Sequence, residues 1–273
     1  MKLSVLIENE SMSPEFHKEH GLSLYIEALG KNILFDFGAS PNFIENAEKM
    51  KVPLKDVDFC VVSHGHYDHT GGIKAFTELN KKAKIYIRHE GFSDFYAHEN
   101  DGRVVYIGVD KSFFDLPQIV FPPQRMEIMK GVEIFSGVKG SLMNPPGNSQ
   151  LFIDKDGDQS LDDFAHEQSM IITENDKTYL FIGCAHSGIA NIMEQYYKER
   201  KAYPDFVLGG FHLFREEGDP DNSELVISLS DYLKDKPSKY YTCHCTGLPA
   251  YELLKERLKD QIDYLYTGLQ INL

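Results

Sequence analysis

The strongest constraint on the fold is a ten-residue run that carries three histidines, an aspartate and three glycines. It reads Ser63-His-Gly-His-Tyr-Asp-His-Thr-Gly-Gly72. The run follows a largely apolar segment at 57–62, which is typical of a strand buried in a sheet. It precedes a segment at 72–80 with a helical pattern. We therefore predict a strand, a loop and a helix that gather these polar side chains at the end of the strand.

Three imidazoles and a carboxylate are the donor types that hold zinc and similar divalent ions. His64 and His66 can turn toward one ion, while Asp68 and His69, at the start of the next helix, can turn toward a second. Gly65 allows a tight backbone turn between them. The alternative is a surface loop that happens to be rich in histidine, but crowding these groups without a bound ion is unfavourable.

Single histidines elsewhere lie next to predicted strands, where functional groups of layered α/β proteins gather. These candidates are His89, His166, His186, His212 and His244. Cys184 stands two residues before His186. Three further histidines lie in polar stretches with little periodicity, and we interpret them as structural: His17, His20 and His98.

The remaining chain alternates strand and helix patterns. The expected strands are at 3–7, 22–28, 32–37, 83–88, 131–138, 149–154, 169–173, 178–183, 206–208, 239–242 and 262–266. The expected helices are about ten residues from 41, then 189–201, 223–233 and 249–259. Because no linker or change of composition divides the chain, we expect one domain over 1–273, with two sheets packed between helical layers.

The stretch 90–130 differs from the rest, because its periodicity is weak and its aromatic content is high. It contains Phe92, Phe95, Tyr96, Tyr106, Phe113, Phe114 and Phe121. We interpret it as an excursion whose aromatic side chains pack onto the body. A lid or a dimer contact is the alternative.

Charge and cysteine usage limit the partners and the compartment. With 28 Lys and Arg against 42 Asp and Glu, the formal charge is −14, which disfavours nucleic acid and anionic membranes as partners. No run approaches the roughly 18 apolar residues of a membrane span. The four cysteines do not form a disulfide framework. We expect a small-molecule substrate and a reducing cytoplasm, and the oligomeric state stays open.

The motif His64-Gly-His-Tyr-Asp-His69 resembles the HxHxDH signature of the metallo-β-lactamase superfamily. Residues 32–38 (NILFDFG), which include Asp36, resemble the family's early strand ending in an aspartate, and His244-Cys-Thr-Gly247 resembles its final histidine motif. The resemblance implies an α/β fold, a four-layer αββα sandwich of two mixed sheets between helices. Together with GCAHSGI and GGFHL, these motifs resemble the branch named for dihydropterin–ribofuranosylaminobenzene-phosphate synthase.

The resemblance implies a metal set of His64, His66, Asp68, His69, His186 and His244. Which residue corresponds to the family's third metal-binding histidine stays open. Position in the hairpin indicates His166, whereas the branch motif GCxH favours His186. Cys184 stands where the family usually has a bridging aspartate, so it is either a ligand or a thiol that lines the site. Asp36 is a ligand or lies behind one, and His212 and His89 are candidate substrate-binding residues.

The implied function is hydrolysis of an ester, lactone, thioester or phosphoester by a metal-activated water, with Asp68 as ligand and proton shuttle. Two divalent ions are expected, zinc being favoured, with manganese, iron or nickel as alternatives. One competing interpretation is a pterin-related transferase that binds a phosphorylated aminobenzene substrate, its phosphate held by Lys139, Lys155 or Arg215. The other is a metal-bound binding module without turnover.

Overall fold

The computed structural model describes residues 1–215 and 221–273, and its first large sheet joins both ends of the chain. Across this sheet the order is β18 (Gln270–Asn272), β1 (Lys2–Ile7), β2 (Ser23–Ala28), β3 (Lys31–Phe35), β4 (Phe59–Val61), β5 (Lys84–Tyr86) and β8 (Ile119–Val120). β2 is antiparallel to both β1 and β3, whereas β3, β4, β5 and β8 run parallel. Leu29 and Gly30, both at positive φ, make the tight β2–β3 turn.

The second large sheet uses the later part of the chain. Its order is β17 (Ile262–Tyr264), β16 (Lys239–Thr242), β15 (Phe206–Gly209), β14 (Lys177–Phe181), β13 (Gln168–Glu174), β10 (Val132–Ser136) and β9 (Arg125–Met129). β9, β10, β13 and β14 are antiparallel, and β14 to β17 are parallel. Both large sheets are therefore mixed.

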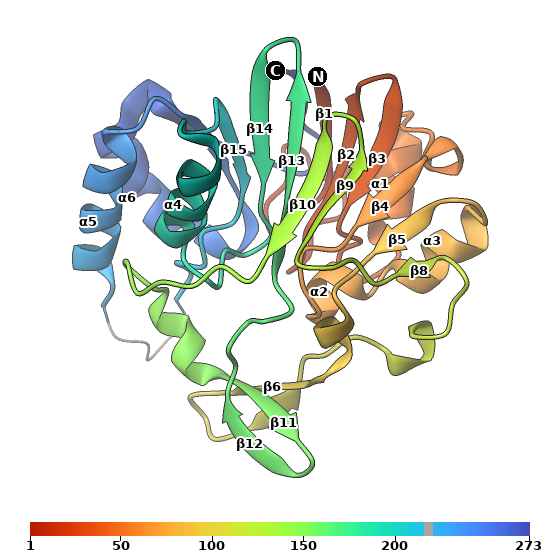
Figure 1. Ribbon diagram of the computed structural model, residues 1–273, viewed down its shortest axis with the longest axis horizontal. Helices are drawn as coiled ribbons and strands as arrows, with labels where there is room; N and C mark the ends of the chain where they lie inside the picture. Colours follow the sequence, from red (N-terminus) through yellow and green to blue (C-terminus); the bar gives the residue numbers. More distant parts are fainter. Residues whose placement is uncertain (216–220) are drawn as a thin grey trace.

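The two sheets pack face to face, and helices cover their outer faces (Figure 1). Helices α1 (Asn42–Lys49) and α3 (Ile73–Leu79) cover the first sheet, and α4 (Ile189–Arg200), α5 (Ser223–Lys234) and α6 (Leu248–Leu258) cover the second. Side chains alternate as a strand requires: Ile33 and Phe35 face the other sheet, and Leu34 faces the helices. The predicted four-layer αββα sandwich is confirmed.

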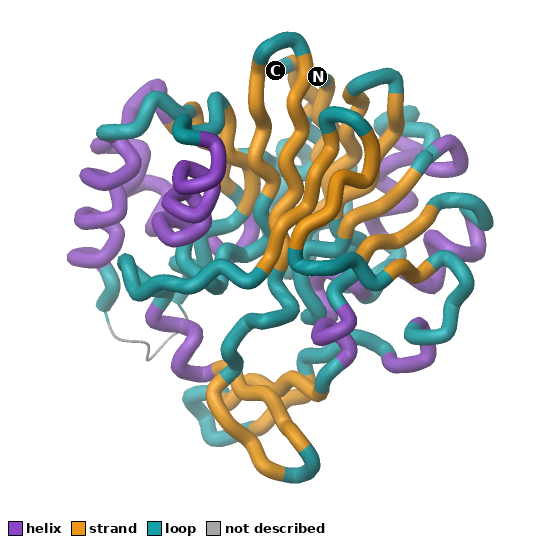
Figure 2. Tube along the Cα trace, in the orientation of Figure 1, coloured by secondary structure: helices purple, strands orange, loops and turns teal. Residues whose placement is uncertain are grey.

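A third, smaller sheet lies apart from the sandwich, at the bottom of the view in Figure 2. Its order is β12 (Asp158–Leu161), β11 (Leu151–Lys155), β6 (Asp94–His98) and β7 (Val104–Tyr106). Residues 90–130, expected as an excursion, are thus divided among three sheets: β6 and β7 join this one, and β8 and β9 are edge strands of the two large ones. Sequence patterns missed these strands because they are short and mostly half-buried or exposed.

The topology brings several loops to one edge of the sandwich. β1, β3 and β4 point the same way in the first sheet, as β14, β15 and β16 do in the second. Five of these strands are followed within three residues by a side chain singled out above: Asp36 after β3, His64 after β4, Cys184 after β14, His212 after β15 and His244 after β16. The small sheet faces the same edge (Figure 1). Among the described residues, no helix is long and apolar enough to cross a membrane.

Candidate metal centre

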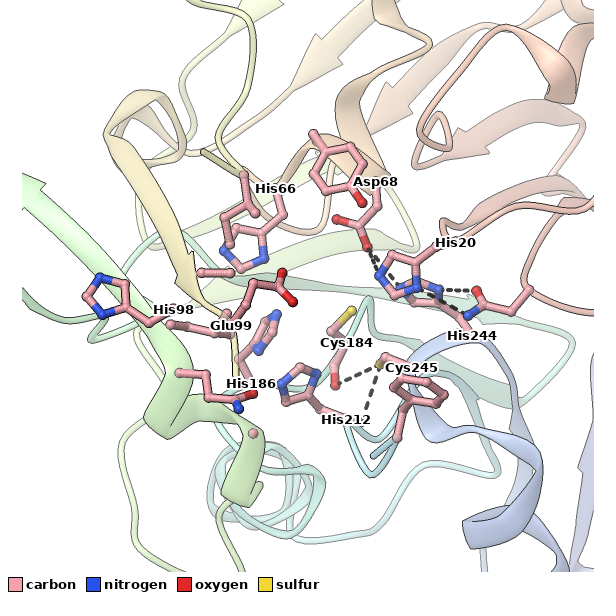
Figure 3. Close-up of a pocket in the computed structure, with 18 residues that line it drawn as sticks. His20, His66, Asp68, His98, Glu99, Cys184, His186, His212, His244 and Cys245 are labelled. Atoms are coloured by element: carbon pink, nitrogen blue, oxygen red, sulfur yellow. Dashed lines mark hydrogen bonds and ion pairs between the residues drawn. The ribbon is translucent and has the colours of Figure 1, made fainter. Parts of the chain in front are cut away.

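A pocket of about 550 Å³ opens between the sandwich edge and the small sheet. One wall holds His66, Asp68, Cys184, His186 and His244 from the loops after β4, β14 and β16 (Figure 3). The opposite wall comes from the small sheet and the segment before β11, and includes Ala97, His98, Glu99, Gln150 and Leu151. The volume of the pocket lies within the usual range for small-molecule sites.

The first donor group joins both large sheets. The Nε2 atom of His69 lies 3.2 Å from Cys184 Sγ, 3.2 Å from His244 Nε2 and 3.3 Å from Asp68 Oδ2. His244 Nε2 also lies 3.2 Å from Asp68 Oδ2. Ligands bound tetrahedrally at about 2.0 Å stand about 3.3 Å apart, which matches these four distances, and all four buried donor atoms lie within 4.8 Å of one another. The group can therefore surround a single ion.

The second donor group shares Cys184 with the first. His64 Nε2 lies 3.3 Å from His186 Nε2, and both nitrogens lie within 4.8 Å of Cys184 Sγ. A nitrogen of His66 falls within 4.8 Å of donors on His64 and Asp68. Burial lowers the pKa of His64 and of His186 well below the usual value, and neighbouring histidines lower it further. Both rings are therefore neutral, the form that binds metal.

Four of these histidines are held from behind, so that each Nε2 atom faces the centre. The outer Nδ1–H groups donate to oxygens of neighbouring side chains: His64 to Ser63 Oγ at 2.9 Å, His69 to Asp36 Oδ2 at 2.7 Å, His186 to Asn148 Oδ1 at 3.2 Å and His244 to Asn9 Oδ1 at 2.7 Å. Such outer hydrogen bonds fix the ring orientation and tautomer of metal-binding histidines. The arrangement is therefore preorganised for ligation.

Asp36 lies behind the centre and does not face the pocket. It follows β3 at positive φ, where its Oδ1 accepts the Ser63 backbone N–H at 2.6 Å and its Oδ2 accepts the Ser63 hydroxyl at 2.7 Å. Although burial favours the neutral ring, the carboxylates of Asp68 and Asp36 raise the pKa of His69 to about 10. This electrostatic environment stabilises positive charge at the centre, as a cation site requires.

His166 lies near the second group with both ring nitrogens occupied. Its Nδ1 accepts the Gly65 backbone N–H at 2.9 Å, so Nε2 carries the proton and donates to Asp162 Oδ2 at 3.0 Å. His66 Nε2, buried and without a hydrogen-bond partner, lies 3.9 Å from the same oxygen. The geometry thus brings His186 into the donor group and places His166 behind the motif loop, as a support for its backbone.

Two buried carboxylates hold the backbone of the ligand loops. Glu167 accepts the N–H groups of His186 at 2.6 Å and Ser187 at 2.9 Å. Glu8 accepts the His244 N–H at 3.0 Å, and burial raises the pKa of Glu8 to about 8 despite that bond. These carboxylates fix where the loops after β14 and β16 turn.

The two histidines predicted to bind substrate, His212 and His89, lie in different places. His212 lines the pocket, with its ring centroid 4.3 Å from that of His186. His89 is not among the residues that line the pocket: its ring packs on Phe114 and Phe121 at the surface, so the structure gives its prediction as a substrate-binding residue no support.

Sequence reasoning missed two pocket histidines by interpreting them as structural. His20 Nε2 lies 3.3 Å from Asp68 Oδ2, and His20 Nδ1 accepts from Asn9 Nδ2 at 3.2 Å. His98 lines the wall of the small sheet. No local pattern marks either residue. The parallel course of β1 and β3 could have indicated that the loop after β1 reaches the same edge.

Cys245 also turns toward the pocket. His244 adopts φ 52° and a short 3₁₀ turn covers His244–Thr246, so alternation of side chains fails there. Cys245 lines the pocket, whereas Cys243 packs between the two sheets.

Fold and pocket together define a two-sheet α/β protein with a buried, histidine-rich centre suited to divalent metal ions. The family model of the metallo-beta-lactamase superfamily matches residues 19–153, which include the histidine motif. The resemblance to this superfamily that the sequence shows is therefore confirmed.

Two relatives and one solved structure are similar to this protein over nearly the whole length of both chains. An uncharacterized protein of Methanocaldococcus jannaschii is 29% identical over 262 residues, covering 93% of this chain and 94% of that protein. The 7,8-dihydropterin-6-methyl-4-(beta-D-ribofuranosyl)-aminobenzene-5'-phosphate synthase of the same organism is 28% identical over 271 residues, covering 93% and 90%. The crystal structure of Tm1679, a metal-dependent hydrolase of the beta-lactamase superfamily, has a TM-score of 0.83 at 25% identity, covering 100% and 99%.

Proposed function

We propose that this protein is a metal-dependent hydrolase that holds two divalent ions. The observation that carries the proposal is the position of Cys184, whose sulfur belongs both to the group with Asp68, His69 and His244 and to the group with His64 and His186. Two ions bound there would lower the pKa of a water to about 7 and polarise a carbonyl or phosphoryl oxygen. Zinc is the favoured ion because the donors are imidazole, thiolate and carboxylate.

Asp68 is the proposed catalytic base. Its Oδ2 faces the pocket and lies within 3.3 Å of three imidazole nitrogens, on His20, His69 and His244. A proton that Asp68 takes from an attacking water has a short path outward through His20, whose side chain is about half exposed. His20 therefore links the buried base to solvent or to a leaving group.

The pocket walls support a compact, weakly charged substrate. Of the described residues that line the pocket, none is lysine or arginine, whereas Asp68 and Glu99 contribute carboxylates. Ile107, Leu151 and Phe214 add apolar surface. We therefore propose an ester, lactone or thioester ahead of a phosphoester as the small-molecule substrate. We also propose the cytoplasm as compartment, where four free cysteines stay reduced.

A pterin-related synthase is the second candidate, and the name of one relative favours it. That name specifies a substrate with a 5'-phosphate, for which Lys139, Lys155 and Arg215 were the candidate partners. None of the three lines the pocket, and Arg215 pairs with Asp221 at 3.1 Å. The walls therefore favour the hydrolase.

Metal analysis combined with a substrate panel tests the proposal. Purified protein given excess zinc should retain about two ions per chain after gel filtration. It should hydrolyse at least one member of a panel of chromogenic esters, lactones, thioesters and phosphodiesters, and a chelator should abolish that turnover. No more than one ion per chain would refute the dinuclear centre. Metal binding without turnover on any class would favour the binding module or the synthase.

A further inference from the structure

Two cysteine side chains lie side by side at the inner end of the pocket. Cys184 follows β14 and Cys245 follows β16, and β15 between these parallel strands brings the two loops together. Their sulfur atoms and one ring nitrogen of His212 all lie within 4.8 Å of one another. All three residues line the pocket and are labelled in Figure 3.

Local contacts hold the Cys245 sulfur on the side of Cys184. Cys245 Sγ accepts the backbone N–H of His212 at 3.3 Å and donates to the carbonyl oxygen of Cys184 at 3.6 Å. The Nδ1 atom of His212 is buried beside them without a hydrogen-bond partner. This polar setting differs from that of the remaining cysteines, because Cys60 and Cys243 lie within apolar clusters.

We propose that Cys184 and Cys245 are an oxidation site, and that a hydroperoxide converts them into an intramolecular disulfide when the centre is free of metal. The pocket admits a small oxidant to both sulfurs. Cys245 attacks one peroxide oxygen, which gives a sulfenic acid and releases an alcohol, or water from hydrogen peroxide. Cys184 then displaces the hydroxyl group as water and forms the S–S bond. Two thiols lose two electrons, and the peroxide gains them.

The disulfide would remove the sulfur that the two donor groups share. Cys184 Sγ lies 3.2 Å from His69 Nε2, and a disulfide sulfur has no negative charge to offer a divalent ion. Oxidation and metal binding therefore exclude each other at Cys184. The reaction itself does not depend on the proposed hydrolysis; only its consequence for metal content rests on the proposed centre.

Mass spectrometry of the full chain tests the pairing independently of activity. Protein stripped of metal by a chelator is treated with hydrogen peroxide, alkylated under denaturing conditions and digested. We expect a cross-linked peptide pair containing Cys184 and Cys245, two hydrogens lighter than the reduced pair, with Cys60 and Cys243 alkylated. Zinc present during the treatment should lower the yield at least tenfold. Absence of this cross-link in the metal-free protein would overturn the proposal, as would a mixture of pairings that includes Cys60 or Cys243.

Two variants and a metal measurement complete the design. Cys245→Ser should abolish the cross-link, whereas the matched control Cys243→Ala, from the same segment but outside the pocket, should form it as the wild type does; circular dichroism confirms that both fold. The oxidised wild type should retain less zinc than the reduced protein and recover it after dithiothreitol. If the cross-link forms and zinc content is unchanged, the oxidation site stands but Cys184 is not a ligand, which contradicts the proposed centre instead.

Discussion

Replacing His186 or His166 with alanine should have opposite consequences for metal content and for stability. His186 presents a free Nε2 atom 3.3 Å from His64 Nε2 at the centre, whereas both nitrogens of His166 are hydrogen-bonded to the protein. His186→Ala should therefore lose one ion. His166→Ala should keep both ions at saturating metal and lose stability.

The structure gives the size of each effect. Without His166, the buried Asp162 carboxylate loses the N–H donor to its Oδ2 atom and keeps the Phe164 N–H bond at 2.8 Å. Leaving a buried acceptor without its donor costs about 1–3 kcal/mol, and the charge of the carboxylate places the expected loss near the upper end. Because the lost Gly65 contact supports the motif loop, metal affinity should fall about 10- to 100-fold. His186→Ala gives up the Asn148 hydrogen bond, worth about 1 kcal/mol.

Two measurements on each variant check these values. Urea unfolding of the metal-free proteins gives the loss of unfolding free energy, and elemental analysis after gel filtration in excess zinc gives the ion content. The double variant His166→Ala/Asp162→Asn serves as control, because removing the unpaired charge should recover part of the lost stability. The reasoning is refuted if His166→Ala loses an ion while His186→Ala retains two.

Three further predictions concern the motif and its supports. Asp68→Asn should lower kcat at least about a hundredfold on any accepted substrate, with the fold intact by circular dichroism, because it removes the proposed base; activity within tenfold of wild type would exclude that role. Asp36→Asn should weaken zinc affinity about 10- to 100-fold in a chelator competition, since Asp36 Oδ2 fixes His69 at 2.7 Å, and an unchanged affinity would contradict this. Gly65→Ala should lower unfolding free energy by about 1–3 kcal/mol in urea titrations, because its Cβ would stand 2.1 Å from the Gly91 carbonyl oxygen; a neutral result would show that the loop can shift.

Most of the sandwich could be predicted because its signals are local. The apolar patterns that mark β3, β13 and β14 follow from burial on the faces of a sheet, and the segments around α4 and α6 repeat at helical spacing. The short strands β6, β7, β8 and β12, which are mostly half-buried or exposed, have no comparable pattern. Their pairing is decided by partners distant in sequence, as β6 shows by pairing with β11.

The motif from His64 to His69 could also be predicted from the sequence, since its residues are close together in the chain. Three of the four outer hydrogen bonds could not be predicted, because they join distant segments: Asp36 to His69, Asn9 to His244 and Asn148 to His186. His20 illustrates the limit most clearly, since its polar surroundings in sequence gave no sign of its contact with Asp68.

By itself the sequence determined the fold class and the residues from His64 to His69 that mark a metal centre, because strand periodicity and ligand spacing are properties of neighbouring residues. Only the tertiary structure decided which of His166 and His186 faces the donors, and that Cys184 lies between two groups. These outcomes depend on where loops from separate strands meet and on which nitrogens the surrounding hydrogen bonds already occupy. Such contacts are set by packing across the whole chain, and no local pattern encodes them.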